Sequence, residues 1–158
     1  FLPLYYENDT KIVMACKNAN YNPVFFGVDG FDGALEQEGV DVSMFEGFYY
    51  LTPFAYTATD DATVSFVSKF NALAGNNPNQ FAADAYDVVY AIYNALVEAG
   101  ATADMSAQDM GELLCKTFQG GFTYSGLTGS NMTWNENGAV VKAPLAFQVK
   151  DGKLTAAE

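Results

Sequence analysis

The sequence contains no histidine and no arginine, and its seven basic residues are all lysines. Histidine is the most common general acid or base near neutral pH, and arginine is the most common clamp for anionic substrates. The chain also lacks a G-x-S-x-G nucleophile elbow and a G-x-x-x-x-G-K-[ST] phosphate loop. We therefore predict that the protein is not an enzyme and that it needs no cofactor and no metal ion.

Basic charge is scarce as a whole, because 19 acidic residues oppose seven lysines and give a formal net charge of −12. Nucleic-acid binding needs basic side chains that displace phosphate counterions, so this balance argues against a nucleic-acid partner. It also disfavours anionic membrane surfaces. We interpret the acidity as a source of solubility rather than as a cation-binding site.

Long apolar runs and closely spaced cysteines are absent too. No run reaches the length of a membrane span, and no signal-peptide pattern is present. Cys16 and Cys115 are too far apart for a metal or redox motif, and we expect buried, inert thiols, with a disulfide as the open alternative. Since Leu2 to Tyr6 reads as the end of a strand, we expect the chain to be a fragment, with any export signal upstream.

Segments typical of strands alternate with segments of helical period. This order predicts an α/β fold: a three-layer αβα lobe with a mainly parallel sheet, followed by a C-terminal antiparallel β ribbon. We expect residues 1–158 to form a single ligand-binding lobe. The predicted strands are 2–6, 24–28 and 45–52; the predicted helices start near 9, 60, 80 and 106; the ribbon starts at 122.

The longest predicted helix, about 80–99, has two apolar faces. A helix that is apolar on most sides is normally buried on most sides, and we expect that here. One face comprises Ala85, Val88, Val89, Ile92 and Leu96; the other comprises Tyr86, Tyr90, Tyr93 and Val97. In the preceding helix we expect Val64, Val67, Phe70 and Ala74 to point inward.

The candidate site lies where the predicted strands end. Ligands of open parallel sheets bind beyond the carboxyl ends of the strands, and Asp29 ends the second strand while Tyr5 and Tyr6 end the first. Phe81 begins the long helix. A carboxylate between aromatic walls suits an ammonium group, with a cation–π contribution of about 0.5–2 kcal/mol.

Each candidate also has a purely structural interpretation. Asp29 is also consistent with a loop residue that accepts backbone N–H bonds before Gly30. The rings of Tyr5, Tyr6 and Phe31 are equally consistent with core or interdomain packing. Phe81 also fits a hydrophobic contact at the start of a helix, and we interpret Trp134 in the ribbon as a packing residue.

Four motifs in order resemble the leucine/isoleucine/valine-type substrate-binding proteins of ABC importers. The first is Pro-Leu-Tyr-Tyr at 3–6, and the second is V-F-F-G-V-D-G-F at 24–31. The third is the helix start at 77–87, N-P-N-Q-F-A-A-D-A-Y-D, and the fourth is G-L-T-G at 126–129 followed by T-W-N-E-N-G at 133–138. The likeness is to the second half of such proteins.

This resemblance implies a type I periplasmic-binding fold of two lobes that close on the ligand by hinge motion. It implies that Asp29 receives the ligand's α-ammonium and that Tyr5 or Tyr6 supplies an aromatic wall. Gly30 and Phe31 would line the same loop, and Phe81 would add a ring from the helix start.

The resemblance also implies an extracytoplasmic receptor for an amino acid, of the branched-chain type first, that docks on a membrane permease. It would be periplasmic, or a cell-surface lipoprotein in a Gram-positive bacterium. Alternatives are a sensor domain on the same fold, a receptor for amides or other small solutes, and an enzyme using Asp29 or Asp32. Because the sequence stops just past the last predicted strand, we favour transport over sensing.

Overall fold

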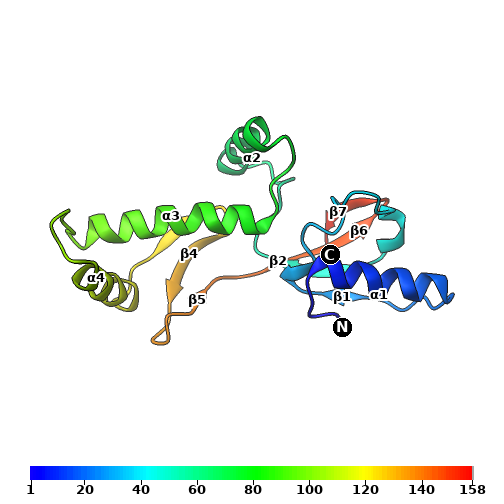
Figure 1. Ribbon diagram of the computed structural model, residues 1–158, viewed down its shortest axis with the longest axis horizontal. Coiled ribbons are helices and arrows are strands. Elements are labelled where there is room, and N and C mark those ends of the chain that lie inside the picture. The colour runs from blue at the N-terminus through cyan, green and yellow to red at the C-terminus, as the bar shows by residue number, and fades with distance from the viewer. Residues whose placement is uncertain (158) are drawn as a thin grey trace. The chain divides into compact units, whose positions relative to one another are not determined.

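The computed structural model describes residues 1–157 and groups them into two compact units. Unit 1 consists of Phe1–Asp60 with Pro144–Glu158, and unit 2 consists of Asp61–Ala143 (Figure 1). The single ligand-binding lobe expected over residues 1–158 stays a prediction. Each unit is described by itself below.

Unit 1 is built on a four-stranded sheet in the order β1-β2-β6-β7. The β1–β2 pair is parallel and the other two pairs are antiparallel. The predicted α/β class is therefore confirmed, but this sheet is mixed rather than mainly parallel. Its elements are α1 (Tyr6–Asn18), β1 (Phe26–Gly27), the 3-10 helices η1 (Asp29–Phe31) and η2 (Val42–Phe45), β2 (Tyr49–Thr52), β6 (Leu145–Lys150) and β7 (Lys153–Ala156).

The first predicted strand is reduced to one parallel bridge between Leu2 and Gly27. Pro3 has no N–H to donate to a ladder, and α1 already begins at Tyr6, whereas the sequence predicts a helix start near 9. The third strand begins at Tyr49 rather than Phe45. The preceding residues form η2 instead, because the Asp41 carboxylate accepts a hydrogen bond from the Ser43 N–H (3.0 Å).

The core of unit 1 is aromatic. Phe31 stacks on Phe48 with ring centroids 4.0 Å apart and meets the edge of Phe45 at 5.3 Å. Tyr50 joins the same group, 4.9 Å from Phe31. All four rings are buried, so the loop that follows β1 is held to the sheet by the ring of Phe31.

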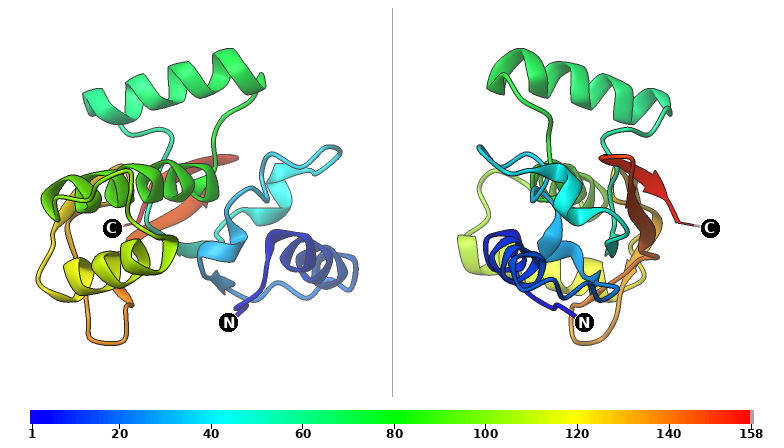
Figure 2. Two further views of the ribbon diagram at one scale, coloured as in Figure 1. Left: turned by 60° about the vertical axis from the view of Figure 1, so that its left-hand side comes forward. Right: turned by 90° about the vertical axis from the view of Figure 1, so that its right-hand side faces the viewer.

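Unit 2 combines three helices with a three-stranded antiparallel sheet in the order β3-β4-β5, which confirms the predicted ribbon. Helix α2 contacts α3 through Phe66 and Tyr86, whose ring centroids are 5.0 Å apart. Figure 2 shows the ribbon of these helices from two further sides. The elements are α2 (Asp61–Ala74), α3 (Gln80–Glu98), α4 (Ala107–Gln119), β3 (Tyr124–Gly126), β4 (Gly129–Trp134) and β5 (Val140–Val141).

Local capping signals set the ends of these helices. The Asn79 side chain accepts a hydrogen bond from the Ala82 N–H (3.1 Å), and α3 ends before Gly100, whose φ is +68°. Ser106 and Asp109 have the sequence spacing that predicts a capping box, and this is confirmed because the Ser106 hydroxyl accepts from the Asp109 N–H (3.1 Å). Asn20 follows the first helical pattern, where an asparagine predicts a left-handed helix end, and it adopts that conformation with φ +54°.

Burial in unit 2 differs from the prediction. Helix α3 buries Gln80 and a narrow stripe of Ala83, Asp87, Ala91 and Ala95, while its larger apolar residues are exposed except Leu96, which is half-buried. In α2, Phe66 is buried and Val64 is exposed. No helix in the described part of the chain is both long and apolar enough to cross a membrane.

The two cysteines and the tryptophan differ in how far they are buried and packed. Both thiols are free; Cys16 is half-buried, and Cys115 is exposed, so the predicted burial is wrong for Cys115. Trp134 packs edge-on against Phe118 (4.6 Å) and lies 5.8 Å from Phe122, which confirms its predicted packing role.

Candidate functional site

In unit 1 the N-terminal segment and the loop after β1 are in direct contact. Leu2 N–H donates to the Phe26 carbonyl oxygen (2.8 Å), which aligns the two segments in parallel. A few residues further along both segments, Gly30 packs against the carbonyl group of Leu4 and the Cα of Tyr5. A Cβ at residue 30 would overlap the Leu4 carbonyl oxygen. Residue 30 must therefore be glycine for the two segments to approach this closely.

This contact brings Tyr5, Gly30 and Asp29 to one place at the carboxyl ends of the parallel strands. Asp29 is the first residue of η1 and is exposed. Tyr5 immediately precedes α1 and is 65% exposed. Tyr6, the first residue of α1, is half-buried. An exposed carboxylate beside an exposed aromatic residue has the chemistry expected for an ammonium group.

The other two candidates lie elsewhere. The Phe31 ring is 1% exposed and belongs to the aromatic core, so its ring is not accessible to a ligand in this structure. Phe81 is the second residue of α3 in unit 2 and is 37% exposed. The ring of Phe31 is thus a core residue, which is the structural alternative given above. A ligand contact by Phe81 stays a prediction.

A buried hydrogen bond supports the loop that carries Asp29. The Tyr50 hydroxyl donates to the Asp32 carboxylate (3.2 Å), and both residues are buried. Burial and the nearby Asp32 carboxylate raise the pKa of Tyr50. Tyr50 therefore stays a hydrogen-bond donor throughout the physiological range and ties the loop to β2.

Asp9, in the first turn of α1, is a buried carboxyl that sequence analysis placed only at the start of this helix. Its side chain is fully buried, and neither carboxylate oxygen has a hydrogen-bond partner among the described residues. Burial raises the pKa of the Asp9 carboxyl from its usual 3.8 to about 6. Its neighbour Thr10 is satisfied, because its hydroxyl bonds the Tyr6 carbonyl oxygen and the Gln37 side chain.

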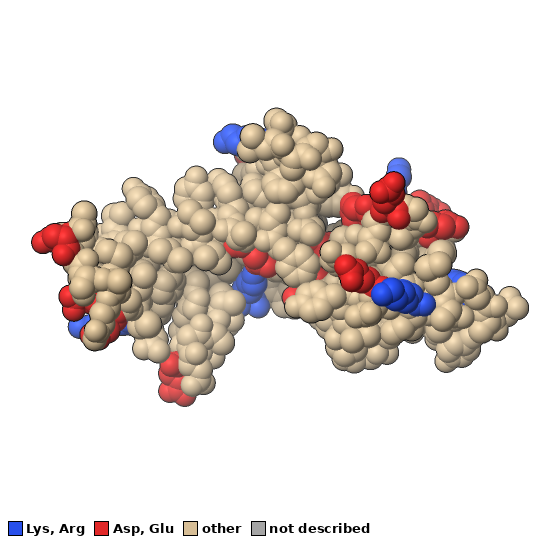
Figure 3. All heavy atoms as spheres, viewed as in Figure 1, with Lys and Arg blue, Asp and Glu red and all other residues tan. Residues whose placement is uncertain are grey.

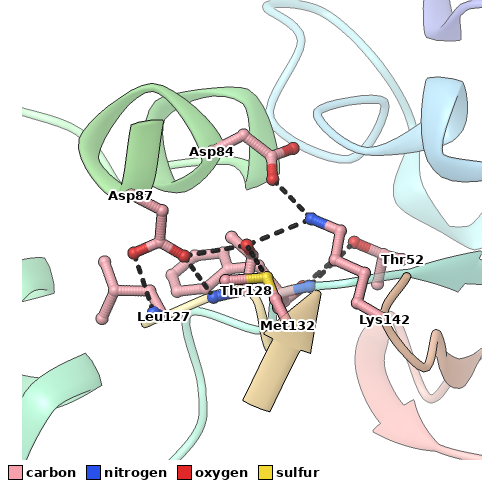
Figure 4. Close-up of polar contacts among 8 residues, drawn as sticks. Thr52, Asp84, Asp87, Leu127, Thr128, Met132 and Lys142 are labelled. Atoms are coloured by element: carbon pink, nitrogen blue, oxygen red, sulfur yellow. Dashed lines mark hydrogen bonds and ion pairs between the residues drawn. The ribbon is translucent and has the colours of Figure 1, made fainter. Parts of the chain in front are cut away.

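Unit 2 contains a further buried carboxylate, Asp87, whose two oxygens both accept hydrogen bonds (Figure 4). Asp87 on α3 accepts from the N–H of Leu127 (2.9 Å), the N–H of Thr128 (2.8 Å) and the Thr128 hydroxyl (2.8 Å). Gly126 lies so close that a Cβ there would overlap the Asp87 carboxylate. The G-L-T-G motif at 126–129 is therefore the turn through which the ribbon of β3, β4 and β5 is bonded to α3.

Lys142 extends this polar network. Its ammonium group pairs with Asp84 on α3 (2.8 Å) and donates to the Thr128 hydroxyl (3.1 Å) (Figure 4). The two ion-pair side chains are 21% and 37% exposed. Together, Asp84 and Asp87 join the first half of α3 to both ends of β4–β5.

A sequence signal for Asp87 existed but was not used. Asp87 shares the i, i+4 stripe of Ala83, Ala91 and Ala95, and an acidic residue in a stripe of buried small residues implies a buried partner. No comparable signal marks Asp9, because an acidic residue early in a helix usually serves the helix dipole from the surface.

The chain was compared with known proteins. A family described as "Periplasmic binding protein" matches residues 4–153. No curated protein matches the chain. Solved structures with the same fold include the leucine-binding protein LivK of Thermotoga maritima, with 20% identity and a TM-score of 0.74 over 99% of this chain and 42% of LivK.

Two further structures broaden the comparison. The branched-chain amino acid binding protein LivJ of Streptococcus pneumoniae, in complex with isoleucine, has 24% identity and a TM-score of 0.77 over 99% of this chain and 42% of LivJ. A solute-binding protein of R. palustris, in complex with benzoate, has 17% identity and a TM-score of 0.72 over 93% and 38%. The chain thus spans about two-fifths of the length of these solved proteins.

Proposed function

Because the chain belongs to the periplasmic binding protein family, we propose that it is part of an extracytoplasmic receptor that binds a small amine-bearing solute. The first candidate ligand is an amino acid of the branched-chain type. The complete receptor is proposed to have two lobes, to deliver its ligand to the permease of an ABC importer, and to catalyse no reaction.

The observation that carries this proposal is the contact between Gly30 and the backbone of Leu4 and Tyr5. It holds the Asp29 carboxylate and the exposed Tyr5 side chain at the same end of the parallel strands. A carboxylate pairs with an ammonium group, and an adjacent ring excludes water and adds a cation–π attraction. The resemblance alone supports the roles proposed for Tyr6, Gly30, Phe31 and Phe81.

The charge at Asp29 discriminates between ligand classes seen in the solved relatives. LivJ was crystallised with isoleucine, and another relative with benzoate. Benzoate is an anion without an ammonium group, and a carboxylate at Asp29 would repel it. The acidic surface of the chain adds to this repulsion (Figure 3). Both features favour an amino acid over an aromatic acid.

The test is calorimetry on the complete receptor that contains this chain, titrated with leucine, isoleucine, valine and benzoate. Asp29→Ala should lose on the order of 3–5 kcal/mol of amino-acid binding, because an ammonium would be buried without its partner. Asp29→Asn keeps the shape and should lose most of the same affinity. Glu38→Gln, an exposed change in the same unit, is the matched control and should bind normally.

Unchanged affinity in Asp29→Ala would remove Asp29 from the site. The chain by itself should bind amino acids weakly or not at all, since the rest of a two-lobed site would be missing. Tight binding by the chain alone, or benzoate binding stronger than leucine binding, would contradict the proposal.

A further inference from the structure

Asp9 on α1 is a buried acid to which the proposed binding of a solute gives no role. It lies in the first turn of the helix, and its side chain is fully buried. Neither oxygen of its carboxyl group has a hydrogen-bond partner among the described residues. Most buried polar groups in proteins are hydrogen-bonded, so the consequences of this exception depend on what surrounds Asp9.

The surroundings of Asp9 are apolar. Asp9 lies one helical turn before Val13, so both side chains leave the same side of α1. Val13 is fully buried and belongs to the core cluster that contains Phe31 and Phe45. The Asp9 carboxyl therefore points toward the core of unit 1, on the side of α1 against which η1 and η2 pack.

The elements that pack against this side of α1 offer no cation to an ionised Asp9. Residues 18–68, which include η1, η2 and the loop between them, contain no basic residue. The charged groups of η1, η2 and their flanking loops are all acidic: Asp29, Asp32, Glu36, Glu38, Asp41 and Glu46. The uncharged titratable groups of α1 and the core cluster are Tyr6, Cys16 and Tyr50.

The charged groups of α1 itself do not pair with Asp9 either. Glu7 and Lys11 are exposed, and Lys17 lies two helical turns further along. An ionised Asp9 would therefore be an unpaired negative charge in an apolar core, which is strongly disfavoured.

Asp9 is connected to the candidate solute site through the backbone of α1. The N–H groups of Asn8 and Asp9 both donate to the Tyr5 carbonyl oxygen (2.9 and 3.1 Å). The Cα of Tyr5 packs against Gly30, which follows Asp29 in η1. A movement of the first turn of α1 would therefore also separate Tyr5 from the loop that carries Asp29.

Ionisation of Asp9 favours such a movement, because a carboxylate is stable in water and not in the core. Burial accordingly raises the pKa of the Asp9 carboxyl from 3.8 to about 6. The packed arrangement of the first turn is fully favoured below pH 3.8, and it loses stability as the pH rises through 6.

We propose that Asp9 is a proton-controlled support of the solute site: its neutral carboxyl keeps the first turn of α1 packed, and its ionisation loosens the contact between Tyr5 and Gly30. The receptor then binds its solute more tightly in weakly acidic than in neutral medium, and binding takes up protons. The inference rests on the proposed solute site at Asp29 and Tyr5.

The experiment is calorimetry of leucine binding to the complete receptor at pH 5, 6 and 7.5, with the wild type and Asp9→Asn compared at each pH. Asparagine has nearly the same shape and does not ionise, so the titration of other groups cancels in the ratio of the two association constants. Between pH 5 and 7.5 the wild-type constant, relative to that of Asp9→Asn, should fall by about three- to tenfold. A smaller fall, or a rise, would overturn the proposal.

The matched control is Glu7→Gln, which removes an exposed carboxylate from the same turn and should keep the pH dependence of the wild type. At pH 5.5, titrations in two buffers of different ionisation enthalpy should show more proton uptake in the wild type than in Asp9→Asn. Equal uptake would contradict the proposal. A constant ratio together with lost binding in Asp29→Ala would remove the role of Asp9 and leave the proposed function standing.

If leucine does not bind at any pH, the proposed function fails for this solute, and hydrogen exchange without ligand tests Asp9 by itself. Relative to their intrinsic rates, the amides of Asn8 and Asp9 should exchange faster in the wild type than in Asp9→Asn at pH 7.5. Equal protection would overturn the proposal. If Asp9→Asn does not fold, protection of these amides in the wild type should be lower at pH 7.5 than at pH 5, and equal protection would again overturn it.

Discussion

Gly30 lies against the carbonyl group of Leu4, with no room for a side chain between the two backbones. This contact joins the loop that bears Asp29 to the segment that bears Tyr5, and so defines the geometry of the candidate site. Position 30 requires glycine because there is no room for a Cβ. Its φ imposes no such requirement, since it is not in the left-handed region.

Gly30→Ala should therefore destabilise unit 1 by about 1–3 kcal/mol, the usual cost of overpacking a close contact. Gly111→Ala is the matched control, because its added Cβ meets nothing within 4 Å and lies inside α4. It should stabilise the protein by about 0.5–1 kcal/mol through helix propensity. Urea denaturation of both variants checks the prediction, and equal effects would contradict it.

Asp9→Asn should change how stability depends on pH. Since the pKa of the buried Asp9 carboxyl is raised to about 6, the folded state binds a proton that the unfolded state releases at a pKa near 3.8. The resulting stabilisation is present below pH 3.8 and is lost as the pH rises through 6. The free energy of unfolding of the wild type should fall by about 1–3 kcal/mol over this window relative to Asp9→Asn.

Denaturant melts at pH 4, 5, 6 and 7.5 measure that difference. Glu7→Gln, an exposed change on the same helix, controls for the loss of a negative charge near the helix start. A pH profile of Asp9→Asn parallel to that of the wild type would show that the Asp9 carboxyl does not titrate with a raised pKa.

Asp87→Ala should destabilise unit 2 by on the order of 2–4 kcal/mol, because it leaves the N–H groups of Leu127 and Thr128 without an acceptor. Asp84→Asn breaks only a partly exposed ion pair with Lys142 and should cost about 0–1 kcal/mol. Hydrogen exchange of the two amides should accelerate in Asp87→Ala and not in Asp84→Asn. If the Leu127 and Thr128 amides stay protected in Asp87→Ala, Asp87 does not hold the ribbon to α3.

Tyr50→Phe should cost about 1 kcal/mol, because it removes the buried hydrogen bond to Asp32 without creating a cavity. Tyr49→Phe, on the opposite face of β2, should have a smaller effect. Thermal melts of the two variants test this ranking. A larger loss in Tyr49→Phe would show that the Tyr50–Asp32 bond does not stabilise the loop.

Sequence analysis succeeded where the determinants are local. The Ser106–Asp109 capping box and the stop of α3 at Gly100 each depend on residues a few positions apart, and both are confirmed. The convergence of Tyr5 and Asp29 was also anticipated, because parallel strands end at the same edge of a sheet.

The failures involve contacts between distant residues. The sequence left open whether the Phe31 ring packs in the core; its packing against Phe45 and Phe48 depends on an approach of residues that no local pattern encodes. The periodicity of α3 described an apolar helix correctly and could not tell which of its sides this chain covers. The burial of Asp9 is of the same kind, since it depends on tertiary packing around α1.

The only tryptophan of the chain is Trp134, enclosed by Phe118 and Phe122 in unit 2. In this chain, tryptophan emission therefore reports on the surroundings of Trp134 within residues 61–143 and not on changes confined to unit 1. If solute added to this chain alters the emission, the helix and ribbon residues around Trp134 have responded, although the Asp29 carboxylate belongs to the other unit.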